Sequence, residues 1–349
     1  MALFSRRSKD SSETPADDAA PEEAVDSEIA GASIDAPDAT SAADDAAAAA
    51  SVSISVSSYG GLGASAPPPA KPQLQPRKTG RAATKVAPRA TETVPGLQDN
   101  VLVREALARL ADGTAPQALL DVARQCLQGH LFLRIKGDAR ALLAEGKELP
   151  LAMVKVGDRA FALAYSSGAA LQASVRADGD ADTSALGQPV LSVIKHVLAG
   201  PYEGLVLDQS SAPARAVLPK DLLKKLLEKV DEKLAIKALL AAERTPETAA
   251  AVAQALAEAP LWVAVGKLDD GRPGIAEGRA EDGSRYLEVY SHPVEVAVMG
   301  RGDQAAPVTA AQLASALGDE GLAGVIVDPA GPWIRLSRDE LSPVFATAA

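Results

Sequence analysis

The chain has 349 residues, which gives room for two domains. Its 46 acidic and 35 basic residues leave a net charge of -11, and this balance argues against general nucleic-acid binding, which needs a positive field over the phosphates. The single cysteine excludes an intramolecular disulfide, and with only three histidines we expect no metal site; no motif calls for a cofactor.

A stable membrane association is not expected either. The sequence has no run of about 18 apolar residues, the length that predicts a spanning helix. The first seven residues include two arginines, but no apolar stretch follows them, which is unlike a secretory signal. We therefore expect a cytoplasmic protein.

Residues 1–97 are predicted to be a disordered arm and linker. Residues 1–50 contain 12 acidic and three basic residues and too few apolar ones to offset the entropy of ordering. Residues 71–89 contain six basic residues and no acidic one among several prolines, which is typical of an extended linker. Residues 51–57 alternate Ser with Val or Ile and allow two interpretations: a strand added to an exposed sheet edge, or a low-complexity segment that stays disordered. We expect the second.

Strands and helices in succession from residue 98 onward predict an α+β fold. The expected elements are helices at 99–111 and 115–128, a strand at 130–136, a hairpin at 151–165, a short strand at 169–175, a helix at 189–199, and a buried strand at 204–208 that leads through a strand or turn to a helix. Gly157 and Asp158 mark the hairpin turn, and Pro116 suits the first position of a helix.

The same series is predicted a second time. Its elements are helices at 228–243 and 246–258, a strand at 261–267, a hairpin at 274–290, a short strand at 294–299, a helix at 307–317 and a buried strand at 323–328. Thr245 is the expected N-cap of the helix that starts at Pro246. A stripe of leucines across 220–243 predicts one helix that closes the first series, runs into the second and holds the two in a fixed relation.

An internal comparison favours two tandem copies of one domain. With a shift of 130 residues, 131–133 falls on 261–263; with a shift of 125, 165–166 falls on 290–291; with a shift of 118, 218–221 falls on 336–339. The shift decreases along the chain, as it should where the second copy has shorter loops. We predict domains at residues 98–227 and 228–349.

Four segments of the second copy carry a family resemblance. They are Pro260 to Val265, Tyr286 to Tyr290, Gly324 to Pro329 and Leu336 to Asp339. They resemble the SseB N-terminal domain, named for enhanced serine sensitivity, and residues 204–221 of the first copy resemble it more loosely. The resemblance implies a compact α+β domain of the bacterial cytoplasm without an established enzymatic activity or defined catalytic residues. Better-known members pair this domain with a different C-terminal domain.

One candidate ligand site comes from matched acid–base pairs. Asp208 and Asp328 each end a predicted buried strand, and Arg215 and Arg335 follow them by seven residues. Strand ends often collect ligand groups, so the four residues together form a candidate site for a small polar ligand. The alternative is a turn-forming aspartate with a solvated arginine, and we favour it.

No catalytic residues are predicted. The three histidines do not cluster, Cys126 lies in an amphipathic helix as a small hydrophobe, and neither a nucleophile elbow nor a phosphate loop is present. Six aromatic residues match in pairs between the copies and are expected to be core anchors: Phe132 with Trp262, Phe161 with Tyr286, and Tyr165 with Tyr290.

The sequence therefore favours a non-enzymatic interaction or regulatory protein that binds a protein partner through its tandem domains. The alternative is a small-molecule-binding module with its ligand between the two copies. A hydrolase or transferase whose site assembles only in space is the third hypothesis.

Overall fold

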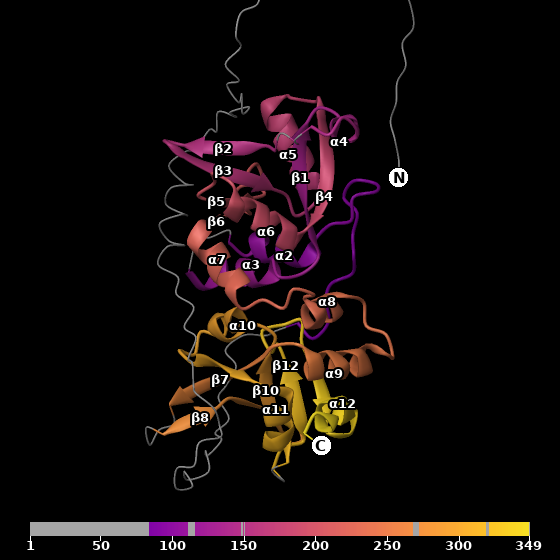
Figure 1. The fold of residues 1–349 in the computed structure, drawn as a ribbon, viewed down its shortest axis with the longest axis vertical. Coiled ribbons are helices and arrows are strands. Elements are labelled where there is room, and N and C mark those ends of the chain that lie inside the picture. The colour runs from indigo at the N-terminus through magenta and orange to yellow at the C-terminus, as the bar shows by residue number, and fades with distance from the viewer. Residues whose placement is uncertain are drawn as a thin grey trace, which may run out of the picture.

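The computed structural model describes residues 84–110, 116–147, 149, 151–267, 272–318 and 321–348. Figure 1 shows two α+β units stacked along the long axis, with the first half (residues 84–228) above the second half (residues 235–348). The α+β prediction is confirmed. The predictions for residues 1–83, including the alternating segment 51–57, lie outside the described residues.

The first half holds two β-sheets and six helices among its described residues. Its strands are β1 (His130–Lys136), β2 (Met153–Val156), β3 (Arg159–Ala164), β4 (Thr183–Pro189), β5 (Gly204–Leu207) and β6 (Ala216–Pro219). Its helices are α2 (Val101–Ala108), α3 (Pro116–Gln125), α4 (Ala139–Ala144), α5 (Gly168–Asp178), α6 (Val190–Ala199) and α7 (Lys220–Glu228). One sheet has the order β2-β3-β5-β6, and β1 pairs with β4. A bridge between Phe132 and Tyr165 joins β1 to the end of β3.

The second half is built around a seven-stranded sheet. Its helices are α8 (Ala235–Ala241), α9 (Thr248–Glu258), α10 (Pro293–Val298), α11 (Ala310–Leu317), the 3-10 helix η1 (Asp339–Leu341) and α12 (Ser342–Ala346). Its strands are β7 (Leu261–Lys267), β8 (Pro273–Ile275), β9 (Glu277–Arg279), β10 (Arg285–Tyr290), β11 (Gln304–Val308), β12 (Gly324–Val327) and β13 (Ile334–Ser337). The order is β11-β7-β10-β12-β13, with β8 on β7 and β9 on β10.

The strand pairings of the two halves follow the same pattern. β3 runs parallel to β5, as β10 does to β12, and an antiparallel edge strand follows in each half, β6 or β13. At the other side, β4 pairs antiparallel with β1 as β11 does with β7. Each half also has one cis proline, Pro213 and Pro332, in the loop before that edge strand.

Most predicted elements are present, but two short strands are wrong. Residues 168–178 and 293–298 form helices α5 and α10. Ser167 is the N-cap of α5, where its hydroxyl accepts from the amide of Ala170, and the left-handed Gly179 ends the helix. Strands β4 and β11 were not predicted, since most residues of these edge strands are partly exposed or small and lack a strong apolar alternation.

The connection between the halves also differs from the prediction. Instead of one helix across 220–243, α7 ends at Glu228 and α8 begins after Leu234, whose φ of 48° is left-handed and cannot continue a helix. Helix α9 begins at Thr248 with Glu247 in the N-cap position, so the prediction for Thr245 is wrong. The amide of Thr245 instead donates to the Thr248 hydroxyl.

Apolar side chains fill both faces of the sheets. On one face of each half the helices cover a large core, centred on Leu119, Ile194 and Leu205 in the first half and on Leu256, Leu313 and Val325 in the second. The matched aromatics belong mainly to the opposite faces. Five of the six are buried, and Tyr286 is only partly covered.

Candidate functional site

Two aspartates hold equivalent places at the ends of the central parallel strands. Asp208 follows β5 and Asp328 follows β12, with φ angles of 52° and 49°, a left-handed conformation that aspartate tolerates better than most residues. Each carboxylate accepts hydrogen bonds from the amide and the hydroxyl of one serine, Ser166 or Ser291, located just after the neighbouring parallel strand. The Asp–Ser contact thus ties the ends of two adjacent strands together.

Burial raises the pKa of both carboxyls to about 6. For Asp208 the bonds from Ser166 and the charge of Arg104 act in the opposite direction. For Asp328, burial and Glu295 raise the pKa, while Lys237 and Ser291 lower it. Both groups are carboxylates at neutral pH, and each is at most 3% exposed.

The arginines of the candidate site lie on or next to the edge strands that follow the aspartates. Arg335 is exposed on β13, with its guanidinium 5.1 Å from the centre of the Tyr286 ring. Arg215 is partly buried just before β6. The ligand site that combines these arginines with Asp208 and Asp328 stays a prediction.

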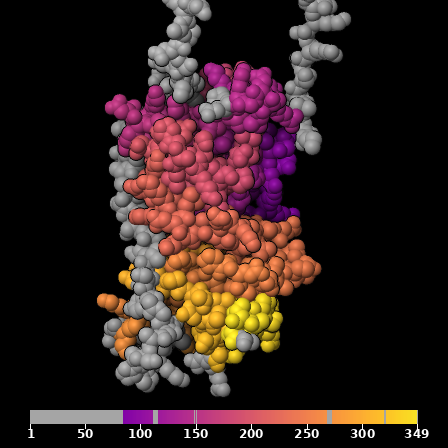
Figure 2. Space-filling view, in the orientation of Figure 1, coloured from indigo at the N-terminus to yellow at the C-terminus, as the bar shows by residue number. Residues whose placement is uncertain are grey.

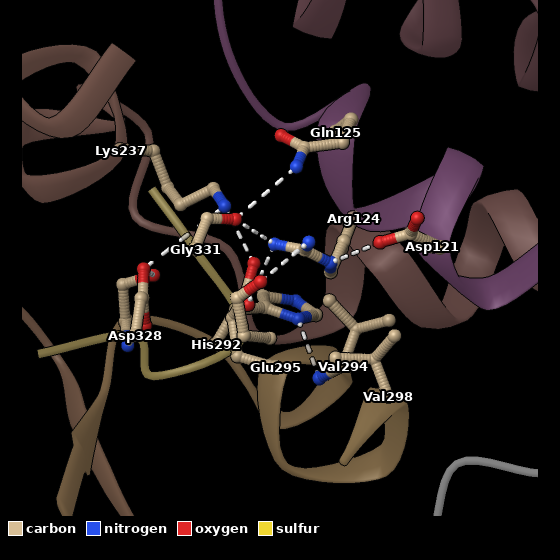
Figure 3. Close-up of polar contacts among 12 residues, drawn as sticks. Asp121, Arg124, Gln125, Lys237, His292, Val294, Glu295, Val298, Asp328 and Gly331 are labelled. Atoms are coloured by element: carbon tan, nitrogen blue, oxygen red, sulfur yellow. Dashed lines mark hydrogen bonds and ion pairs between the residues drawn. The ribbon is translucent and has the colours of Figure 1, made fainter. Parts of the chain in front are cut away.

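A second polar cluster, missed from the sequence, joins the halves where α3 meets α10 (Figure 3). We call Asp121, Arg124, Lys237, Glu295 and Asp328 the joint cluster. The guanidinium of Arg124 donates from Nε to Asp121 at 2.8 Å and from Nη1 to Glu295 at 3.3 Å. It also donates to the carbonyls of residues 330 and 331 in the second half. One first-half side chain therefore bonds both a carboxylate and the backbone of the other half.

Lys237 completes the charge balance around Glu295. Its Nζ lies 2.5 Å from Glu295 Oε1 and 4.0 Å from Asp328 Oδ2. Burial alone would raise the pKa of Glu295, but Lys237 and Arg124 outweigh it and lower that pKa. Likewise, burial would lower the pKa of Arg124, but Glu295 and Asp121 raise it. The charged forms of Glu295 and Arg124 thus stabilise each other, although Glu295 is 0% exposed.

His292 caps α10 beside this cluster. Its Nδ1 accepts from the amide of Val294, and its Nε2 donates to the carbonyl of Leu226 in α7, both at 3.0 Å. Burial lowers the pKa of His292 to about 4, so the ring is neutral at neutral pH. Its role in the described structure is to connect α10 with the last turn of α7.

Apolar packing seals the joint. Val294, Val298 and Ala330 of the second half belong to the core of the first half. The cavity bordered by Lys237 and His292 measures about 10 Å³, which is at the lower limit for one water molecule. The joint is therefore a packed interface with no room for an organic ligand.

A signal for the joint cluster was present in the sequence. Lys237 and Glu295 each interrupt an otherwise apolar run of a helix, and Arg124 follows the apolar pair Val122 and Ala123 in α3. A charge in such a place indicates a buried, paired group, because an unpaired buried charge is very costly. Its partners could not be named, since Arg124 and Glu295 are 171 positions apart.

Cys126 was the other candidate nucleophile, and the sequence predicted it to be a small hydrophobe rather than a reactive thiol. Cys126 is buried, and burial raises the pKa of its thiol to about 12. Among the described residues, no group of three or more His, Cys, Asp or Glu side chains is arranged to hold a metal ion. No helix in the described part of the chain is long and apolar enough to cross a membrane.

Comparison with known proteins gives one match. Residues 235–342 match the family model of the SseB protein N-terminal domain. The matched range runs from the first turn of α8 to the start of α12, contains all four segments that carried the resemblance, and covers less than a third of the chain. No curated protein and no solved structure matches the chain.

Proposed function

We propose that the chain is a non-enzymatic interaction protein of the SseB type, in which both halves together present one surface to a protein partner in the cytoplasm. The joint is the observation that carries this proposal. Arg124 and Lys237 converge on Glu295, and Val294 and Val298 enter the core of the other half. Such a joint holds the outer surfaces of the halves in one relative position.

We also propose that residues 98–227 and 228–349 are two copies of one ancestral domain. The shared strand pairings and the two Asp–Ser contacts support this. The family match supports the SseB type for the second copy directly, and the first copy only through its likeness to the second.

The contact with a partner would be mainly polar. Among the described residues, only Val86 and Leu143 are large hydrophobic side chains with high exposure, at 47% and 56%. Interfaces between proteins that also exist apart are on average no more apolar than the remaining surface, so a polar face is compatible with specific binding.

Affinity capture with the full chain tests the proposal. We expect one protein to be recovered from native extract in near-stoichiometric amount. The variant Glu295→Gln, which weakens the joint, should reduce its recovery, whereas Glu232→Gln should not, because Glu232 is 85% exposed in a surface ion pair. Recovery of no stoichiometric partner, or equal recovery by both variants, would contradict the proposal.

The small-molecule alternative stays a hypothesis for Asp208, Arg215, Asp328 and Arg335. Thermal shift against a metabolite library tests it, because a ligand of the folded state raises the melting temperature. A large cleft at another place between the halves gives ligand binding separate support, as argued next.

A further inference from the structure

A cleft of about 1060 Å³ lies at the boundary of the two halves, and none of its lining residues belongs to the joint cluster. Four stretches of chain line it: 86–90, 98–102 at the start of α2, 128–130 before β1, and 238–244 at the end of α8. Binding sites for small molecules commonly occupy about 300–1,000 Å³ and prefer boundaries between domains. The cleft is at the upper end of that range.

The segment 84–99 forms one wall and is attached to both halves (indigo in Figures 1 and 2). At its start, the carbonyl of Lys85 lies 3.5 Å from Arg244 Nη2, and the ammonium lies 5.6 Å from the centre of the Trp333 ring. At its other end, the Thr93 hydroxyl accepts from the amide of Ala169, and the Asp99 carboxylate pairs with Arg104 of α2. We predicted a disordered linker up to residue 97, and these contacts correct that prediction for residues 85–97.

Arg244 gives the cleft its chemical character. Its Nη2 donates to the carbonyl of Trp333 at 3.3 Å, while Nη1 is covered and has no hydrogen-bond partner among the described residues. Burial lowers the pKa of Arg244, whereas carboxylate neighbours raise the pKa of Arg124, Arg134 and Arg301. Arg244 is thus a partly desolvated cation without the carboxylate that the other three have in the described structure.

The other lining groups add little negative charge. Arg89 and His130 share the cleft with Arg244, and so does the N-terminal end of α2, which favours anions. Asp99 is already bonded to Arg104 and to two threonines. Glu243 is the other acid of the lining and is exposed. With Asp99 neutralised by Arg104, the charged lining groups left are Arg89, Arg244 and Glu243, a balance of one positive charge in a chain with a net charge of -11.

We propose that this cleft binds a small organic anion, with a carboxylate or phosphate group near the guanidinium of Arg244. The wall formed by residues 84–99 is tied to both halves, so the space suits a small molecule better than a folded partner. This site is separate from Asp208, Asp328 and the joint, and it does not depend on the protein partner proposed above.

Calorimetry and thermal shift on the full chain test the site with three probes: succinate, glycerol phosphate and inorganic phosphate, each compared with sodium chloride at equal ionic strength. We expect saturable binding of at least one probe. Arg244→Gln should weaken it about 10-fold or more, the loss of one hydrogen bond to a charged group. Ala242→Trp, at an exposed lining position, should also block it by filling the cleft. The matched control, Arg335→Gln, removes an exposed arginine outside the cleft and should bind normally.

The pattern of results identifies the ligand group or overturns the proposal. Binding of succinate alone assigns a carboxylate, and binding of the two phosphate probes alone assigns a phosphate. The proposal is wrong if no probe exceeds chloride, or if Arg244→Gln and Ala242→Trp bind as the wild type does. Loss of binding in Arg335→Gln but not in Arg244→Gln would instead favour the Asp208 and Asp328 hypothesis.

Discussion

Replacing Glu295 with Gln should be among the most destabilising charge changes in the chain. The substitution keeps the shape of the side chain and removes only its negative charge, so it opens no cavity. Lys237 and Arg124, which are 6% and 2% exposed, then lose the acid that both contact. Breaking a buried ion pair on one side costs about 3–5 kcal/mol, because the remaining charge stays buried with less compensation, here Asp121 for Arg124 and Asp328 at 4.0 Å for Lys237.

The matched control is Glu232→Gln. Glu232 and Lys195 form an ion pair of the same chemistry at 3.6 Å, but their side chains are 85% and 57% exposed. Exposed pairs contribute about 0–1 kcal/mol, so the two variants should differ by several kcal/mol. For a unit of this size, about 2–4 °C per kcal/mol gives a decrease of roughly 6–20 °C in melting temperature for Glu295→Gln.

Tryptophan fluorescence during urea or thermal unfolding is the direct assay. The chain has two tryptophans, Trp262 and Trp333, and both are in the second half, so the signal reports the half that contains Glu295. The loss in free energy of unfolding caused by Glu295→Gln should stay largely unchanged in salt up to about 1 M, because buried ion pairs are screened little. A cost within 1 kcal/mol of the Glu232→Gln value would refute our reasoning that this ion cluster holds the joint.

Three further predictions concern single buried positions. The Cys126 thiol, whose pKa burial raises to about 12, should react with a thiol reagent only on unfolding; fast reaction of the native protein would contradict this. Because burial raises the pKa of the Asp208 carboxyl from 3.8 to about 6, this group binds more protons in the folded than in the unfolded state between these values, so its contribution to the free energy of unfolding should fall as pH rises from about 4 to 6. Asp208→Asn should remove this contribution, so the difference in stability between the wild type and the variant should change over that pH range. An NMR titration midpoint below 4 for the Asp208 carboxyl would contradict the prediction. Gly204→Ala should cost about 1–3 kcal/mol in urea unfolding, since its Cβ would lie 2.4 Å from the Leu218 carbonyl, whereas Gly187→Ala, with 3.6 Å to its nearest neighbour, should cost little.

Local signals in the sequence predicted most of the elements. The turn at Gly157 and Asp158 lies between β2 and β3, and the apolar runs at 204–208 and 323–328 became the central strands β5 and β12. Residues 168–178 form a helix and not the predicted strand at 169–175, with Ser167 as the N-cap and the left-handed Gly179 as the C-cap. β4 lacks a strong apolar alternation of its own and is a strand because it pairs with β1.

The candidate site shows where such reasoning ends. The equivalence of Asp208 and Asp328 was predicted from internal similarity, and both indeed end central strands. Their serine partners were not predicted, since hydrogen bonds between residues about 40 positions apart leave no periodic trace. The same limit applies to the cleft, because its four lining stretches converge only in three dimensions.

The cations near the two strand-end aspartates have different partners. In each half, a cation on the first helix lowers the pKa of the strand-end aspartate: Arg104 of α2 acts on Asp208, and Lys237 of α8 acts on Asp328. Arg104 bonds Asp99, which immediately precedes α2, so that pair is local to the first half.

Lys237 instead bonds Glu295 of α10, and this acid also takes Arg124 from the first half. Glu295 therefore connects a cation of its own half, Lys237, with a cation of the other half, Arg124. Lys237 also lies 4.0 Å from Asp328, so the strand-end aspartate of the second half is part of the ion cluster that links the halves.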